Sequence, residues 1–152
     1  MVTHSDPEEL DRNWAELLQE VRVAQTGVQI LTAFLLTVPF APGFERLGTH
    51  DRRVFAAILV CALLSTLLLM APVALHRQLF HQRRRVWLVD TAHRLAQFGL
   101  SLLVVAYVGA AWLVLDLILS PAVAAAAAIL LSVVAVGTWL VLPAWERRHG
   151  DP

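Results

Sequence analysis

Residues 54–75 read VFAAILVCALLSTLLLMAPVAL and contain no charged side chain. A helix needs roughly 20 apolar residues to cross the hydrocarbon core of a bilayer. A charge at its centre costs roughly 2.5–3.5 kcal/mol on insertion scales. Three further stretches, about 23–44, 95–115 and 122–144, are also long, apolar and free of charge except for Asp116 just past the third. The sequence therefore predicts an all-α fold, a four-helix transmembrane bundle.

The composition excludes most soluble classes of protein. Of 152 residues, 58% are hydrophobic and only 16% are charged, which is far more apolar than a typical soluble domain. Twelve arginines, with no lysine, balance twelve acidic residues, so net charge indicates no nucleic-acid partner. The one cysteine, Cys61, has no Cys/His spacing around it, so we expect no metal and no cofactor.

The residues before the first apolar stretch predict an amphipathic helix. Ser5-Asp6-Pro7-Glu8 has the pattern of a capping box with proline at the first helical position. Acidic side chains dominate residues 1–22, and their apolar residues recur at helical spacing. We expect one integral membrane domain over residues 1–152, in which this helix leads into the first span and residues 145–152 form a tail.

The arginines predict an orientation. No proline or glycine occurs from Val73 to Phe98, so the second and third helices are expected to extend beyond the membrane and meet in a cytoplasmic hairpin near residues 82–85. If all four spans form, nine of the twelve arginines share one side, namely Arg12, Arg22, Arg77, Arg83, Arg84, Arg85, Arg94, Arg147 and Arg148. The positive-inside rule then predicts a plasma-membrane protein with both termini cytoplasmic.

Small residues predict how the helices pack. Ala124, Ala128 and Ser132 form one small-residue ridge in the fourth span, and Ala106 and Ala110, next to Gly109, form another in the third. Such ridges let helix backbones approach closely. We therefore expect the third and fourth spans to pack through them. Pro72 is expected to kink the second helix.

A polar stripe runs along the first span. Gln25, Thr26 and Gln29 share one arc of a helical wheel with Arg22, and Thr32 lies at its margin. These side chains are out of place in lipid, so they are expected to face protein or water. One interpretation is that Gln25, Thr26, Gln29 and Thr32 line an ion pathway. The other is that they form hydrogen bonds between helices.

A second polar group is expected at the cytoplasmic ends of the helices. Asp90 can pair with Arg94 and reach His93, because these residues are three and four positions apart. A histidine held by a carboxylate could relay protons or sense pH. The alternative is an ordinary ion pair at the membrane interface. The expected polar collar comprises Glu20, Arg22, His76, Arg77, Asp90, His93, Arg94 and Gln97.

The triplet Arg83-Arg84-Arg85 is expected to bind anionic lipid headgroups, at roughly 1 kcal/mol for each residue. An alternative is that the acidic N-terminal helix docks on this triplet as a gate. No catalytic grouping stands out: Ser65, Ser101 and Ser132 have no base in the same layer, and no phosphate-binding glycine loop is present. We therefore do not expect an enzyme.

Three stretches resemble a family of small actinobacterial membrane proteins of unknown function, whose members are often labelled automatically as sodium:proton antiporters. They are WAELLQEVRVAQTGVQIL at 14–31, AFLLTVPF at 33–40 and APVALHR at 71–77. The resemblance implies a four-helix bundle in the plasma membrane. It also implies a distinctive polar set of Glu16, Glu20, Arg22, Gln25, Gln29, His76 and Arg77.

The antiporter label conflicts with the sequence. Secondary antiporters usually carry titratable carboxylates near the midplane, often on broken helices related by inverted repeats. This chain has neither feature, and four helices are too few to build alternating access alone. We therefore expect a homo-oligomeric ion channel or a transporter of protons or monovalent cations. The alternative is a non-transporting membrane protein that binds lipid or a partner subunit through its acidic helix and basic hairpin.

Overall fold

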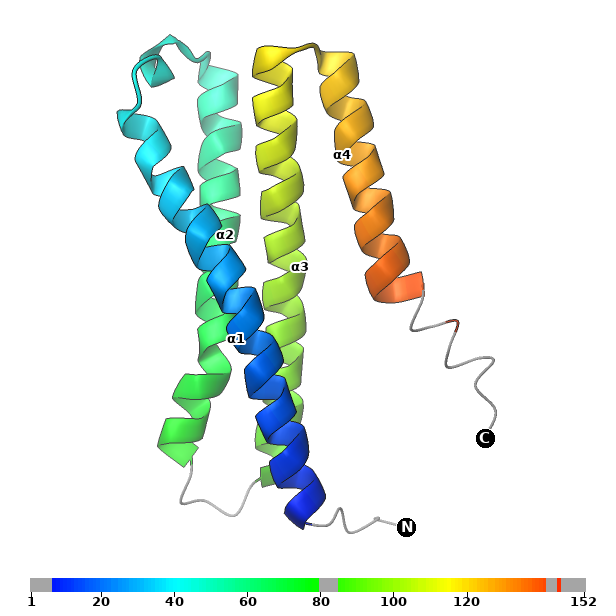
Figure 1. Cartoon of the computed structure of the whole chain (residues 1–152). Helices are drawn as coiled ribbons and strands as arrows, with labels where there is room; N and C mark the ends of the chain where they lie inside the picture. Colours follow the sequence, from blue (N-terminus) through cyan, green and yellow to red (C-terminus); the bar gives the residue numbers. More distant parts are fainter. Residues whose placement is uncertain (1–6, 80–84, 142–144, 146–152) are drawn as a thin grey trace.

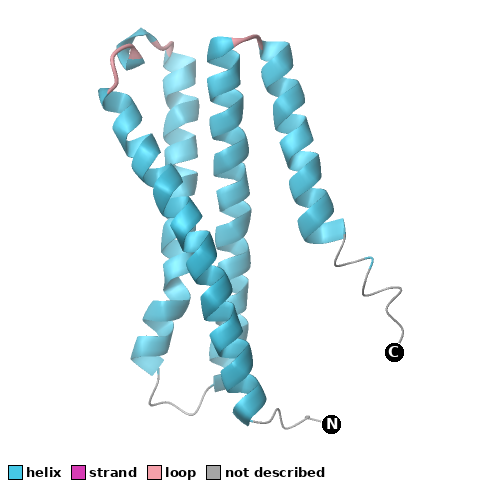
Figure 2. Ribbon diagram, viewed as in Figure 1, coloured by secondary structure: helices cyan, strands magenta, loops and turns pink. Residues whose placement is uncertain are grey.

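The computed structural model describes residues 7–79, 85–141 and 145. Four long helices dominate, namely α1 (Pro7–Thr37), α2 (Thr49–Leu79), α3 (Arg85–Ile118) and α4 (Pro121–Val136) (Figure 1). Two 3-10 turns, η1 (Val38–Phe40) and η2 (Phe44–Arg46), join α1 to α2, and a π-helical turn, η3 (Gly137–Val141), follows α4. The described residues contain no strand, so the predicted all-α class is confirmed (Figure 2).

The ends of α1 follow from its prolines. The helix begins at Pro7, where the missing amide N–H needs no partner. It ends at Thr37 because Pro39 cannot continue the hydrogen-bond ladder, and η1 follows instead. The segment that is apolar enough to cross a membrane is Leu18–Phe40, which includes η1. It begins before the stretch read from the sequence and contains Glu20 and Arg22.

Three further segments are long and apolar enough to cross a membrane: Thr49–Leu75, Asp90–Ile118 and Pro121–Trp139. The helix α3 has 34 residues. At 1.5 Å per residue it spans about 51 Å, which exceeds the roughly 30 Å hydrocarbon core of a bilayer. Its length agrees with the expected extension beyond the membrane. The hairpin expected near residues 82–85 falls largely in 80–84, outside the described residues.

The helices α1, α2 and α3 form a three-helix core. Buried residues of α2 and α3 recur at alternating spacings of three and four, with one spacing of seven at the end of α3, as in left-handed helical bundles. In α2 they are Phe55, Ile58, Ala62, Ser65, Leu69 and Pro72, and in α3 they are Ala92, Ala96, Gly99, Leu103, Ala106 and Leu113. The structure agrees with the prediction for Pro72, since the C-terminal part of α2 turns away from α3 in Figure 1.

The helix α4 stands apart from this core. Within the described residues it packs on α3 and on neither α1 nor α2. The ridge in the third span also faces another helix than expected: Ala106 is buried against α2, and a Cβ placed on Gly109 would lie 2.9 Å from Cγ1 of Ile58. The fourth-span ridge faces α3 as expected: Ala124 is buried, and Ala128 and Ser132 line a groove together with Gly109.

The helix directions place three helix ends at one end of the molecule, and the shorter α4 points toward the same end but stops about halfway along α3. The start of α1, the end of α2 and the start of α3 lie at the bottom of Figure 1, which we call the lower end. The α1–α2 connection and the α3–α4 turn lie at the opposite, upper end. The α3–α4 turn is short because Ser120 caps α4, its side chain accepting from the amide of Val123, and Pro121 follows it.

Candidate functional site

Two of the four predicted pathway residues face α2. Nε2 of Gln25 donates to the backbone oxygen of Leu69 at 2.9 Å, and the hydroxyls of Thr32 and Thr66 lie 3.4 Å apart. Thr32 is only 7% exposed. Both polar side chains of α1 therefore contribute hydrogen bonds between helices.

The acceptor of Gln25 lies beside the proline of α2. Pro72 has no N–H for the carbonyl of Leu68, and its ring disturbs the helical ladder at this turn. Leu69 is the next residue, and its carbonyl oxygen has two lone pairs, so it can accept from Gln25. The amide of Gln25 therefore joins α1 to the turn of α2 that precedes Pro72.

The other two predicted pathway residues face outward. The hydroxyl of Thr26 donates to the backbone oxygen of Arg22 within α1 and is exposed. Gln29 is also exposed, and its side chain makes no hydrogen bond within the described part of the chain. It is the middle residue of the candidate span Leu18–Phe40. An amide with unused donors and acceptors therefore lies on the outer face of α1, halfway along an apolar helix.

Two further bonds between helices were not predicted from the sequence. The hydroxyl of Ser65 in α2 donates to the backbone oxygen of Gly99 in α3 at 2.7 Å. The hydroxyl of Tyr107 in α3 donates to the backbone oxygen of Gly27 in α1 at 3.2 Å. The signal available beforehand was the rarity of hydroxyls in these apolar stretches. The acceptors of these hydroxyls could not be predicted from the sequence, because any backbone carbonyl can accept such a bond.

The centre of the three-helix core is apolar. One cluster holds Val21, Val28, Leu69, Ala92, Ala96 and Leu103, and a second holds Leu35, Phe55, Ile58, Ala62, Ala106 and Leu113. Thr32 and Ser65 are the buried polar side chains among the described residues, and both are hydrogen-bonded. Within the described residues, a single protomer therefore offers no polar path along its core.

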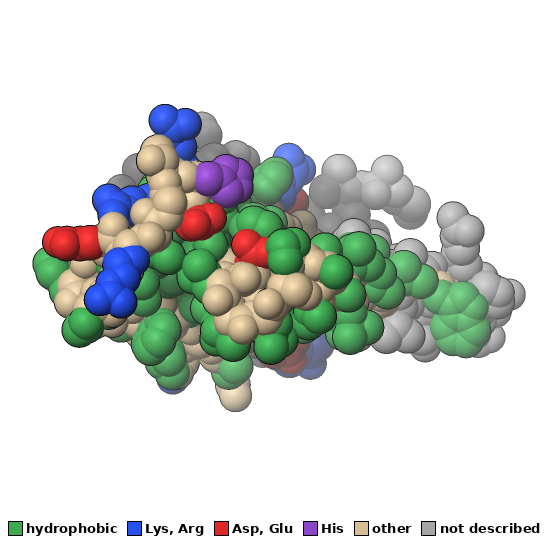
Figure 3. Space-filling model, turned by 90° about the horizontal axis from the view of Figure 1, so that it is seen from above, with side chains coloured by type: hydrophobic (Ala, Val, Ile, Leu, Met, Phe, Trp, Pro, Cys, Tyr) green, Lys and Arg blue, Asp and Glu red, His purple; other side chains and the backbone are tan. Residues whose placement is uncertain are grey.

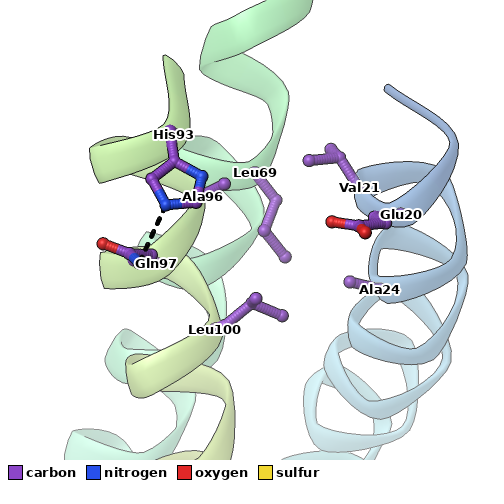
Figure 4. A pocket seen from close by; sticks show the side chains of 8 residues that line it. All are labelled: Glu20, Val21, Ala24, Leu69, His93, Ala96, Gln97 and Leu100. Carbon is purple, nitrogen blue, oxygen red and sulfur yellow. Dashed lines mark hydrogen bonds between the residues drawn. The ribbon is translucent and has the colours of Figure 1, made fainter. Parts of the chain in front are cut away.

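A small cavity opens between α1, α2 and α3 toward the lower end, and we call it the vestibule. Its volume is about 70 Å³. Figure 4 shows Glu20 of α1 facing the side of α3 that carries His93 and Gln97, with Leu69 of α2 behind them. The remaining lining is apolar and comes from Val21, Ala24, Ala96 and Leu100. Three residues of the predicted collar, from two helices, thus meet at one cavity.

The other collar residues that the structure describes lie outside this cavity, and Asp90 and Arg94 form the predicted ion pair. Oδ2 of Asp90 lies 3.0 Å from Nη2 of Arg94, and their side chains are 57% and 70% exposed. His93 bonds Gln97 rather than Asp90, with their Nε2 atoms 3.0 Å apart. Arg22 is exposed and does not line the vestibule. The side chains of His76, Arg77, Arg83, Arg84 and Arg85 lie outside the described part of the structure.

The sequence model of a family of unknown function, DUF6328, matches residues 3–143. The chain belongs to this family. No curated protein and no solved structure matches the chain. No group of three or more His, Cys, Asp or Glu side chains that could hold a metal ion occurs among its described residues.

The upper end of this DUF6328 protein has a compact polar surface. Figure 3 views this end and shows basic, acidic and histidine side chains gathered over one part of it, beside an extended hydrophobic surface. Gly43, with a φ of 105°, turns the chain into η2. The guanidinium of Arg52 then lies 5.8 Å from the ring centroid of Phe44 and donates to the backbone oxygen of Glu45. These contacts anchor the connection on α2.

One carboxylate oxygen at the upper end is buried without a hydrogen bond. It is Oδ1 of Asp116, near the end of α3. A negative charge at a helix C-terminus gains nothing from the helix dipole.

Proposed function

We propose that the protein is an integral membrane protein that assembles as a homo-oligomer and conducts a proton or a monovalent cation. The outward face of α1, with Arg22, Thr26 and Gln29, lines the path in this assembly, and the vestibule lies near its lower mouth. The observation that carries the proposal is the unpaired amide of Gln29, exposed at the middle of a candidate span.

The argument for an assembly is energetic. An unsatisfied polar group in hydrocarbon costs several kcal/mol, because no water is present to pair with it. A second copy of the chain, or a hydrated path between copies, removes this cost. A path inside one protomer would have to pass the two apolar clusters of the core, so the space between protomers is the better place for it.

A channel fits the described helices better than an antiporter does. The carboxylates within the four candidate spans lie close to their ends, at Glu20, Asp51, Asp90 and Asp116. A carrier that exchanges sodium for protons usually needs such a group near the midplane. The middle of α1 offers neutral amide and hydroxyl groups instead, which can solvate an ion without binding it tightly.

The lower end is proposed to face the cytoplasm across the plasma membrane. Most arginines of the chain belong to segments at or next to this end, which is the distribution expected for cytoplasmic loops. Arg83, Arg84 and Arg85 are proposed to attract anionic lipid headgroups there. No cofactor and no catalytic step are part of the proposal.

A second candidate is a membrane protein that transports nothing and binds lipid or a partner subunit. The observation that favours it is that Gln25 and Thr32 hydrogen-bond to α2, so half of the predicted pathway stabilises the protomer. In this case the acidic start of α1 and the basic hairpin would be the binding elements.

Ion flux into liposomes separates the two candidates. Purified protein is reconstituted with a pH-sensitive dye and tested under imposed H⁺, Na⁺, K⁺ and Cl⁻ gradients. We expect flux of one cation, and its loss in Gln29→Leu without a change in protomer stability. Gln25→Leu is the matched control, because it removes an amide that faces α2; it should lower stability and keep flux per folded protein. The absence of ion flux under every gradient with folded protein, or full flux in Gln29→Leu, would overturn the proposal.

A further inference from the structure

The vestibule places a carboxylate and an imidazole on opposite sides of one small cavity. Glu20 comes from α1, and His93, with its neighbour Gln97, comes from α3 (Figure 4). Within the described residues neither Glu20 nor His93 forms an ion pair. The volume of about 70 Å³ leaves room for water, since one water molecule needs roughly 10–15 Å³ by this measure. The two groups are therefore near each other but separated.

No other described charged side chain lines the cavity. From α1 only Glu20 does so, because Glu16 lies one turn away on the surface and Arg22 is exposed outside it. From α2 the lining residue is Leu69. From α3, Asp90 and Arg94 are paired with each other and outside the lining. Glu20 is thus the carboxylate that a charged His93 would meet across the cavity.

The bond between His93 and Gln97 is sensitive to protonation. Nε2 of Gln97 donates to Nε2 of His93 at 3.0 Å. Because Nε2 of His93 accepts this bond, the proton of the neutral imidazole is on Nδ1. A doubly protonated imidazole has donors at both nitrogens and cannot accept this bond. Histidine is the side chain that ordinarily changes charge between pH 5 and 8. Protonation therefore breaks one contact of His93 and gives it an attraction to Glu20.

The lower part of α1 is attached in a way that permits movement. Among the side chains of α1 that the structure describes, the bonds to other helices begin at Gln25, which binds Leu69, and continue at Gly27, whose backbone oxygen accepts from Tyr107. Among residues 18–24 of α1 only Val21 is buried, and it packs in one apolar cluster with Ala92 and Ala96 of α3, with Ala24 at its edge. The segment before Gln25 can therefore tilt about these bonds, and a tilt toward α3 would close the vestibule.

We propose that His93 and Glu20 form a pH-dependent latch. At low pH, protonated His93 leaves Gln97, pairs with Glu20 and draws the lower part of α1 onto α3, so that the vestibule closes. At high pH, neutral His93 returns to Gln97 and the vestibule opens. The effect of the latch on ion flux rests on the proposed function, but the closure itself does not.

A distance measurement between α1 and α3 tests the latch without measuring flux. Nitroxide labels are attached at Arg12→Cys, far from the pivot at Gln25, and at Phe98→Cys, both exposed positions, in a Cys61→Ser background. The full-length protein in liposomes is measured by pulsed electron resonance at about pH 8 and about pH 5, the limits of ordinary histidine titration. We expect a shorter and narrower distance distribution at the lower pH.

Four variants make the result specific. His93→Gln and Glu20→Gln should lose the shift, because each removes one charge of the pair. His93→Arg should give the short distance at both pH values. Asp90→Asn is the matched control and should keep the shift, because Asp90 does not line the vestibule. An unchanged distance in the parent protein, or a shift that persists in His93→Gln, would overturn the latch. Flux without a shift refutes the latch alone, and a shift without flux refutes the proposed conduction alone.

Discussion

Backbone carbonyls are the usual acceptors for the polar side chains that join these helices. Gln25, Ser65 and Tyr107 each donate to a main-chain oxygen of a neighbouring helix, namely that of Leu69, Gly99 and Gly27. In apolar surroundings such bonds contribute modestly, about 0.6 kcal/mol on average and up to about 1.7 kcal/mol. These hydrogen bonds also define the packing geometry, because each one fixes the rotation of one helix relative to its neighbour.

Gln25→Leu is expected to lower the free energy of unfolding by about 0.6–1.7 kcal/mol, because the bond to Leu69 is lost while the apolar volume is roughly kept. Thr26→Val is the control, since the hydroxyl of Thr26 bonds within its own helix. Denaturant unfolding in mixed micelles, followed by tryptophan fluorescence, measures the free energy of unfolding of both variants. Equal losses of unfolding free energy in the two variants would show that the bond between helices adds no stability.

The seam between α2 and α3 is the tightest contact between two elements. A Cβ on Gly99 would lie 2.9 Å from Cγ of Leu69 and 3.3 Å from Cβ of Leu68. The same backbone accepts the bond from Ser65. Glycine at this position therefore sets the distance between the helices, because packing in the apolar core depends on shape at this scale.

Gly99→Ala is expected to destabilise the protein by about 1–3 kcal/mol, the usual cost of overpacking. The side chain of Leu69 must shift, and the bond from Ser65 must lengthen. Gly137→Ala adds the same methyl group where nothing lies within 4 Å, and it should be neutral or slightly stabilising. Thermal unfolding of both variants in the same detergent checks this. A neutral Gly99→Ala would mean that the seam is looser than the structure shows.

At the scale of the whole molecule, the structure is a three-helix core with one helix attached to its side. The contacts of α4 with α3 leave most of its large side chains exposed, and Ala124 is its one buried residue among those described. An apolar groove lined by Val105, Trp112 and Ser132, among others, runs between the two helices. Such a surface is normal for a helix in contact with lipid, where apolar side chains have no reason to be buried.

The orientation of the molecule can be tested by cysteine labelling. In a Cys61→Ser background, Arg12→Cys lies on the lower part of α1 and Arg46→Cys on the upper connection, and both positions are exposed. An impermeant maleimide added to intact cells should label position 46 and should reach position 12 only after lysis, because the arginine-rich end is expected to face the cytoplasm. The reverse pattern would invert the topology.

Much of the fold follows from properties that are local along the chain. Hydropathy over windows of about 20 residues determines that four helices form and roughly where. The prolines determine where α1 begins and ends, and the bend in α2. The spacing of Asp90 and Arg94 is sufficient to predict their ion pair, because residues four apart lie on one face of a helix.

The partners of each helix were decided only in the tertiary structure. Gln25 and Gln29 are one turn apart and look equivalent on a helical wheel, yet one binds α2 and the other faces outward. The same holds for Ala106, which packs on α2 rather than α4, and for Glu20, which meets His93 across a cavity. A wheel shows which residues share a face, but which helix that face meets depends on crossing positions and rotations, and these are set by the sum of many weak contacts across the whole bundle.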